Sequence, residues 1–192
     1  MDRAAYIAMN AASEALRAQS ITAHNIANAG TSGFKALLTH TEAANVEGPG
    51  WHSRVNGVLK PETWNAQGGA LQSTGRDLDI ALADDRWLAV QTKDGGIAYT
   101  RNGALQMTAN GQVLDGEGRP VLTEDGPMAL PPHSELMIAA DGTISLTPQG
   151  SEASVRAQVG RLSVIEAAPS ELKRRADGLF EPLPGADTRP AA

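Results

Sequence analysis

The sequence predicts a mainly β protein, with one long N-terminal α-helix followed by an antiparallel all-β domain of short strands and hairpins. Three observations predict this class. About 28 residues at the start are rich in alanine and contain neither Gly nor Pro. From residue 77 onward, apolar and polar residues alternate with a period of two, which is typical of half-buried strands. Asn102-Gly103 and Asn110-Gly111 lie between such runs, and Asn-Gly pairs favour β-hairpin turns.

The predicted helix carries a seam of small and apolar residues that step by fours and threes, with Gln19 at its one polar position. This heptad-like pattern is typical of helices that pack on other helices. The seam comprises Ala5, Met9, Ala12, Leu16, Ala23 and Ile26. A helix of about 26 residues would be about 39 Å long. We expect Gly30 and Gly33 to end it. The helix is then either an assembly element or a cover for its own domain, and the pattern alone favours neither.

The rest of the chain divides by composition. Residues 36–75 hold turn formers such as Gly48-Pro49-Gly50 and are expected to form an extended connector, with room for two short strands. Residues 76–181 are expected to form the β domain, and the Pro- and Ala-rich residues 182–192 a linker or tail. The predicted strands of the β domain are Leu78–Leu82, Trp87–Gln91, Ile97–Thr100, Ala104–Thr108, Gln112–Asp115, Pro120–Thr123, Glu135–Ala140, Ile144–Thr147, Val155–Val159, Arg161–Glu166 and Leu179-Phe180.

Composition excludes several classes of protein. The chain has 16 basic and 22 acidic residues, a net charge of −6, and no basic run, which argues against nucleic acid as a partner. The absence of cysteine excludes disulfides and thiolate metal sites. No stretch approaches the roughly 20 apolar residues of a membrane span. The N-terminal residues lack the pattern of a secretory signal, so export without a cleaved signal peptide is expected.

No catalytic or cofactor motif is present. His24, His40, His52 and His133 lack metal-ligand spacing. The acidic group of Asp77, Asp79, Asp84 and Asp85 lacks the form of a calcium loop and is interpreted as solvated charge. The basic run Lys173-Arg174-Arg175 is flanked by Glu171 and Asp177 and is interpreted as a solvated turn. A hydrolase would need a clustered acid–base pair, which the sequence does not show. We therefore expect no enzyme activity, cofactor, metal or small-molecule substrate.

A compact motif closes the predicted helix. It comprises Asn25, Ala27, Asn28, Thr31, Gly33, Phe34 and Lys35. Asn28 and Gly33 can adopt turn conformations closed to branched residues, and Thr31 can bond nearby backbone. Phe34 can hold the exit chain against the helix.

A second motif opens the β domain. It comprises Thr74, Gly75, Leu78, Asp79 and Ala81, and then Tyr99, Thr100, Arg101 and Gly103 in the run Tyr-Thr-Arg-Asn-Gly. A third run extends from Val113-Leu114-Asp115 to Val121-Leu122. Three motifs in this order are more specific than any one of them.

Together these segments resemble the flagellar rod and hook family, over roughly residues 1–35 and 70–125. The first matches the family pattern N-x-A-N-x-x-T-x-G-[FY]-[KR], and the second matches L-x-x-T-G-x-x-L-D-[LIV]-A-[IL] followed by Y-T-R-x-G. Within the family, Met1-Asp2-Arg3-Ala4 and the modest length are most similar to the proximal-rod members. Distal-rod and hook members share the motifs and remain alternatives.

The resemblance implies a structural subunit of the flagellar basal-body rod. The helix would lie in the inner core, residues 25–35 would join it to an outer β layer, and the assembly would span the periplasm and transmit torque. The implied partners are other rod and hook proteins and copies of the same chain, with no nucleic acid. A secreted β-rich binding module with a helical oligomerisation tag is the alternative from a different class.

The sequence departs from the family pattern in two places. The family usually has Gly-x-Gly-Phe-Phe after the Leu-Asp-x-Ala run, whereas this chain has Asp84-Asp85-Arg86-Trp87-Leu88, so the turn there is expected to differ. Family members also end in a second long helix that pairs with the first. Nothing after residue 181 resembles one, so the chain is expected either to be truncated or to be built differently.

Overall fold

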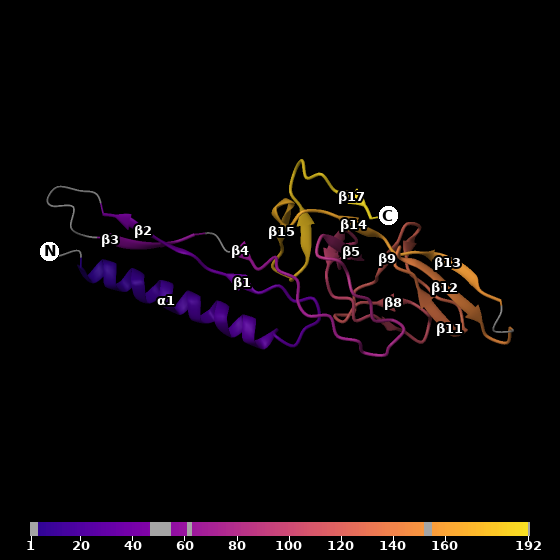
Figure 1. The fold of residues 1–192 in the computed structure, drawn as a ribbon. Helices are drawn as coiled ribbons and strands as arrows, with labels where there is room; N and C mark the ends of the chain where they lie inside the picture. Colours follow the sequence, from indigo (N-terminus) through magenta and orange to yellow (C-terminus); the bar gives the residue numbers. More distant parts are fainter. Residues whose placement is uncertain (1–3, 47–54, 61–62, 152–154, 192) are drawn as a thin grey trace. The chain divides into compact units, whose positions relative to one another are not determined.

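The computed structural model describes residues 4–46, 55–60, 63–151 and 155–191. Three features on which sequence predictions rest lie outside these ranges, namely Gly48-Pro49-Gly50, His52 and the opening Met1-Asp2-Arg3. The chain divides into two compact units, residues 1–65 and 66–192. The prediction of a mainly antiparallel β protein with one N-terminal helix is confirmed (Figure 1).

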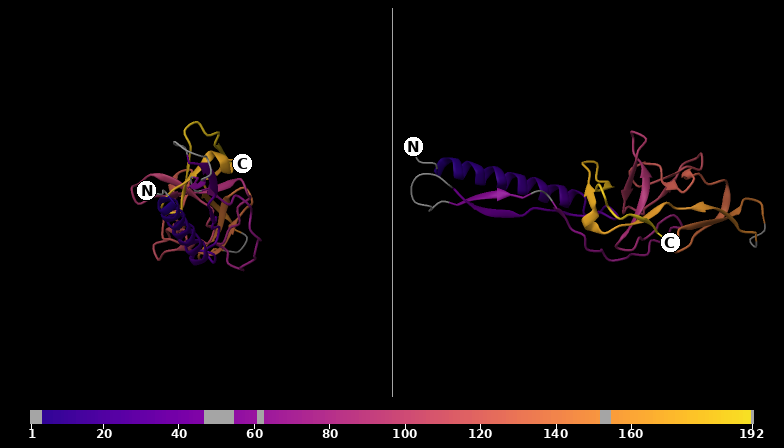
Figure 2. Two further views of the ribbon diagram at one scale, coloured as in Figure 1. Left: turned by 90° about the vertical axis from the view of Figure 1, so that its left-hand side faces the viewer. Right: turned by 90° about the horizontal axis from the view of Figure 1, so that it is seen from above.

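The first unit combines one helix with two small sheets. Helix α1 spans Ala4–Ala27. Strands β1 and β4 pair with each other, as do β2 and β3, all antiparallel. Helix α1 runs alongside the β2–β3 hairpin in the views of Figures 1 and 2. The strands are β1 (Leu37–Leu38), β2 (Thr41–Asn45), β3 (Val55–Leu59) and β4 (Thr63–Trp64). Residues 36–65, expected to form an extended connector, thus contain two antiparallel strand pairs.

The second unit is built on a six-stranded antiparallel sheet in the order β15-β16-β6-β5-β14-β17. A three-stranded sheet, β11-β12-β13, and the small ladders β7-β8 and β9-β10 complete it. The bounds are β5 (Arg86–Gln91), β6 (Ile97–Thr100), β7 (Gln106–Met107), β8 (Val113–Leu114), β9 (Leu122–Thr123), β10 (Gly126–Pro127), β11 (His133–Ile138), β12 (Thr143–Pro148), β13 (Ala157–Arg161), β14 (Val164–Glu166), a 3-10 turn η1 (Pro169–Glu171), β15 (Leu172–Arg174), β16 (Phe180–Pro182) and β17 (Arg189–Pro190).

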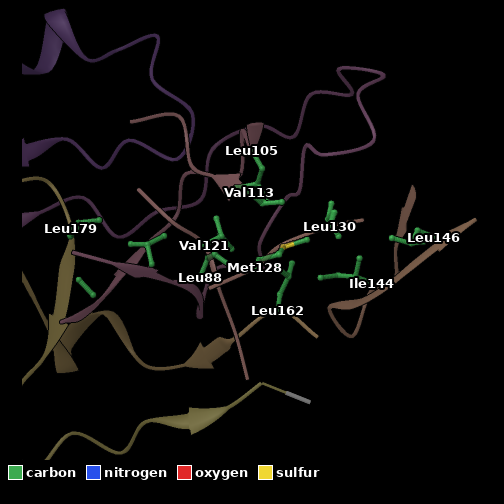
Figure 3. Close-up of a cluster of buried hydrophobic side chains, with 12 residues drawn as sticks. Leu88, Leu105, Val113, Val121, Met128, Leu130, Ile144, Leu146, Leu162 and Leu179 are labelled. Carbon is green, nitrogen blue, oxygen red and sulfur yellow. The ribbon is translucent and has the colours of Figure 1, made fainter. Parts of the chain in front are cut away.

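One hydrophobic core, drawn in Figure 3, holds this unit together. Its members come from both sheets, from β8 and from residues that flank the small ladders. They are Leu88, Val90, Ala98, Leu105, Val113, Val121, Met128, Leu130, Ile144, Leu146, Leu162 and Leu179. Aliphatic side chains supply all of this cluster, in keeping with an aromatic content of only 4%.

Three local expectations differ from the structure. Leu78–Leu82 packs its apolar side chains against the core but forms no strand, because its only ladder contact is an isolated bridge from Asp79 to Ala104. Asn102-Gly103 makes no simple hairpin, since Gly103 lies directly against the carbonyl of Ile80. In residues 182–192, expected as a linker or tail, β17 pairs with β14, and the Ala191 amide donates to the carbonyl of Val164.

Candidate assembly site

One stripe of helix α1 is covered within the first unit, and every other residue of the helix is exposed. The stripe repeats by threes and fours, so it lies along one face of the helix. Half of its members are polar, which is unusual for a buried helix face. The stripe comprises Ile7, Asn10, Glu14, Ala18, Ile21 and Asn25, and Asn28 continues it beyond the helix end.

Asn10 holds the helix against the β2–β3 hairpin. Its amide Nδ2 lies 3.0 Å from the Asn56 Oδ1, 3.0 Å from the Gly57 carbonyl and 3.3 Å from the Glu14 Oε1. Gly57 permits this close approach, since a Cβ there would come within 2.7 Å of a Glu14 carboxylate oxygen. The helix and the hairpin are therefore joined by polar contacts rather than by a thick apolar layer.

Asn25 makes the second polar attachment. Its Nδ2 donates to the carbonyl of Leu37 and its Oδ1 accepts from the amide of Leu37, both at 2.9 Å. The side-chain amide thus pairs with the start of β1 as a neighbouring strand would. This contact fixes where the chain returns along the helix.

The seam predicted from the sequence lies on the opposite side of α1. Ala5, Met9, Ala12, Leu16, Ala23 and Ile26 are all exposed, with Met9, Leu16 and Ile26 at 65%, 67% and 71%. At about 100° per residue, the seam and the covered stripe are roughly 180° apart around the helix. The larger side chains of the seam present apolar surface with no partner among the residues that the structure describes.

Within the motif of residues 25–35, residues 25–27 form the end of helix α1 and a series of tight turns follows from Asn28. The Asn28 side-chain Nδ2 and the Asn28 backbone amide both donate to the carbonyl of His24, so Asn28 holds the last turn of the helix with two hydrogen bonds. The Thr31 amide donates to the Asn28 carbonyl, and the Phe34 amide to the Thr31 carbonyl. Gly33 has φ +70°, a left-handed conformation that suits glycine.

The remaining members of this motif are placed around the same turns. Ala27 is the last residue of α1 and is exposed. The ring of Phe34 lies 5.7 Å from that of His24, so the exit chain contacts the helix at this point. Lys35 is buried, with 7% of its surface exposed.

In the β domain, Arg101 organises the turn that precedes β5. Its guanidinium donates to four backbone carbonyls, those of Leu82, Ala83, Asp84 and Arg86, at 2.6–3.1 Å. Burial lowers the pKa of Arg101, while Asp84 and then Asp85 oppose this shift. The Asp84-Asp85-Arg86 run, which lacks the glycines of the family pattern, is thus stabilised by a side chain from the next hairpin.

The other residues of this motif are spread around Arg101. Thr74 and Gly75 lie in an exposed irregular segment, where Gly75 has φ +71°. Leu78 packs on the core, Asp79 is half-buried and Ala81 is exposed. The hydroxyl of Thr100 accepts from the Asn102 amide. Tyr99 is half-buried, and burial raises its pKa.

Some residues that shape these contacts were not expected from the sequence. The covered stripe of α1 went unrecognised because three of its members are Asn or Glu, although its three- and four-residue spacing is visible. Asp115 also accepts from the backbone amides of Glu117 and Arg119 and pairs with the Arg119 guanidinium, which closes the Gly116-Glu117-Gly118 turn. Within the described residues, no helix is long and apolar enough to cross a membrane, and no group of His, Asp and Glu could hold a metal.

An exposed apolar helix seam, the turn motif that follows the helix and a separate β domain are the features of a structural assembly subunit. Two family models match: "Flagella basal body rod protein" at residues 6–35 and "Flagellar hook protein FlgE/F/G D1 domain" at residues 81–146.

Sequence comparison with individual relatives identifies the family within this class. The chain is 46% identical over 180 residues to the flagellar basal-body rod protein FlgF of Escherichia coli (strain K12), covering 94% of this chain and 71% of that one. It is 44% identical over 180 residues to FlgF of Salmonella typhimurium (strain LT2), with the same coverage. It is 29% identical over 161 residues to the flagellar basal-body rod protein FlgG of Buchnera aphidicola subsp. Schizaphis graminum, covering 76% of this chain and 60% of that one.

The chain belongs to the FlgF family of flagellar basal-body rod proteins. The predictions of a structural rod subunit, of the proximal-rod type and without enzymatic function, are confirmed by this membership. Proteins of this family are part of the flagellar basal body.

Proposed function

We propose that this rod subunit assembles through the exposed seam of helix α1, which packs against helices of neighbouring axial subunits in the inner layer of the rod. The β domain forms the outer layer, and residues 25–35 join the two. Contacts of this head-to-tail kind do not close into a ring and therefore build a filament. The partners are other rod and hook proteins and further copies of the chain.

The observation that carries the proposal is the position of the seam. Helix α1 uses its polar stripe for its own hairpin and leaves Met9, Leu16 and Ile26 exposed on the other side. Burying such side chains in an assembly is favourable, at about 25 cal/mol per Å² of apolar surface removed from water. The small residues Ala5, Ala12 and Ala23 would let a second helix approach closely.

The location follows from the same role. In the assembled flagellum the subunit spans part of the periplasm, transmits torque, and arrives there without a cleaved signal peptide. N-terminal sequencing of the chain from purified basal bodies tests the last point. A processed N-terminus would contradict it.

Two neighbouring alanines provide a matched test of the seam. Ala12 lies in it, whereas Ala11 is also exposed but lies about 100° away around the helix. We expect Ala12→Glu to abolish motility, because it places a charge in the packed interface, and Ala11→Glu to leave cells motile. Swarming assays and electron microscopy of basal bodies measure the two effects, and immunoblotting of exported protein separates assembly from secretion.

Equal motility of the two variants would overturn the role of the seam. The joint is tested independently by replacing Asn28 and Gly33 together, which removes the Asn28 side-chain hydrogen bond and the left-handed turn. We expect that variant to be non-motile. A motile double variant would instead fit a domain whose helix serves only as an oligomerisation tag.

A further inference from the structure

Methionine supplies all the sulfur of this chain, because the sequence has no cysteine. The structure describes four of the five methionines, namely Met9, Met107, Met128 and Met137. Their exposed fractions are 65%, 45%, 2% and 54% in that order, so Met9 is the most exposed of them. Met107 and Met137 lie on β7 and β11 of the β domain, whereas Met9 lies in the seam of α1.

The seam around Met9 is apolar. Its neighbours along the seam are Ala5 and Ala12, about one helical turn away on either side, and neither side chain can donate a hydrogen bond. In the proposed packing a neighbouring helix covers this stretch. A polar atom on the Met9 sulfur would therefore be buried without a partner, which is unfavourable. The seam accommodates a thioether there but not a more polar group.

Peroxides oxidise exposed thioethers by transfer of one oxygen atom. The sulfur attacks one oxygen of hydrogen peroxide, the O–O bond breaks, and the other oxygen leaves as water after a proton shift. The sulfur loses an electron pair and the peroxide gains it, so no further reactant is needed. The product is a sulfoxide, which is polar where the thioether is apolar, and enzymes can reduce it back. Oxidation of this kind disrupts interfaces that contain methionine.

We propose that Met9 is an oxidation-sensitive site of the assembly seam. A peroxide converts its thioether to the sulfoxide in the free subunit, and the sulfoxide prevents the seam from packing. The inference rests on the proposed function, since it needs the seam to be buried in the rod. Once the helix is packed, the neighbouring subunit excludes the oxidant from the sulfur. Peroxide thus acts on free subunits and spares assembled ones.

Two other methionines serve as comparisons. Met137 is exposed, but it lies on β11, away from the seam, and its Sδ accepts a hydrogen bond from the Arg156 Nη1 at 3.5 Å. Its oxidation leaves the surface of α1 unchanged. Met128 belongs to the hydrophobic core of the β domain and is the buried control.

Oxidation of the purified full-length chain tests the site itself. The chain is treated with hydrogen peroxide, and mass spectrometry of its peptides follows the gain of one oxygen atom at each methionine. We expect Met9 to react roughly tenfold faster than Met128, because the core must open before peroxide reaches the Met128 sulfur. Equal rates at the two positions would overturn the proposal.

The effect on assembly is tested in cells that lack methionine sulfoxide reductases. Rods are counted by electron microscopy in cultures that form flagella with or without a sublethal dose of hydrogen peroxide. Each strain is compared with its own untreated culture, so any effect of a substitution alone cancels. We expect peroxide to reduce rod number about fivefold in the wild type and in Met137→Leu, because an unpaired polar group is buried in the seam.

Met9→Leu has no sulfur at this position, so we expect peroxide to change its rod number less than twofold, or about as much as the oxidation of other residues does. Equal peroxide sensitivity of Met9→Leu and the wild type would overturn the proposal.

Peroxide treatment of purified basal bodies separates this inference from the proposed packing. If the seam is buried, Met9 in assembled subunits should react roughly tenfold more slowly than Met9 in the free chain. Equal reaction in both would refute the packing of the seam itself. A protected Met9, together with a Met9→Leu strain as sensitive as the wild type, would refute the role of oxidation alone.

Discussion

The guanidinium carbon of Arg101 lies 5.4 Å from the ring centroid of Trp87, so the cation sits over the indole. Trp87 is fully buried, packs against Phe180 at 4.6 Å between ring centroids, and donates from its Nε1 to the carbonyl of Ala167. A cation over an indole is attracted by the ring quadrupole. Arg101 thus connects the turn before β5, whose carbonyls it binds, to a central aromatic contact of the six-stranded sheet.

We expect Arg101→Ala to destabilise the β domain by about 2–3 kcal/mol, since several charge-assisted hydrogen bonds are lost together and water replaces only part of them. Chemical denaturation of the full-length chain measures this. Arg101→Lys keeps the charge but not the planar fork that reaches four carbonyls, so it should recover less than half of the loss. Wild-type stability of the lysine variant would show that charge alone matters.

The backbone of Ile80 leaves no room for a side chain at Gly103. A Cβ at this position would lie well inside van der Waals contact of the Ile80 carbonyl oxygen, although its backbone is not left-handed. We expect Gly103→Ala to cost about 2–3 kcal/mol of unfolding free energy, because backbone must move to accommodate it. Gly69→Ala is the control, as nothing lies within 4 Å of a Cβ there. A Gly103→Ala variant as stable as Gly69→Ala would contradict the close contact.

The sequence predicts those elements whose signals are local. The helix, β5 and β6 follow from periodicity, and the Asn110-Gly111 turn connects β7 and β8 as expected, with Gly111 at φ +80°. The seam of α1 is visible because its members are small or apolar at regular spacing. Local propensity and pattern agree in all of these segments.

The structure departs from the sequence prediction where a distant group decides the outcome. Leu78–Leu82 alternates as a strand does, yet Arg101 binds the carbonyls of Leu82 and Ala83 that a neighbouring strand would otherwise use. The polar stripe of α1 depends on Asn56, Gly57 and Leu37, which the sequence alone does not place beside the helix. Polar partners that are far apart in the chain produce no periodic pattern in the sequence, so they could not be predicted from it.

Ionisation of the Tyr99 phenol is expected to lower the unfolding free energy of the protein at alkaline pH. Burial raises its pKa above the ordinary value of 10.0, so the folded state binds the phenolic proton more tightly than the unfolded chain does. This contribution is fully present below the unfolded pKa and is lost as pH rises through the folded pKa. We expect the unfolding free energy of the wild type to fall more steeply than that of Tyr99→Phe above about pH 10. Denaturation at each pH measures both unfolding free energies. If those of the wild type and of Tyr99→Phe fell in parallel with rising pH, Tyr99 would not be the source of the pH dependence.

The reciprocal hydrogen bonds of Asn25 with Leu37 predict a local effect in the first unit. Asn25→Ala removes a donor and an acceptor together and leaves both backbone groups of Leu37 without their partner. Because each such bond contributes about 1 kcal/mol, the amide of Leu37 should exchange with solvent roughly tenfold faster. Ser20→Ala, at an exposed position of the same helix, is the control and should leave this rate unchanged. If Leu37 exchanged at the wild-type rate in Asn25→Ala, the helix would be attached to β1 by something other than this amide pair, and the role of Asn25 in the joint would have to be assigned elsewhere.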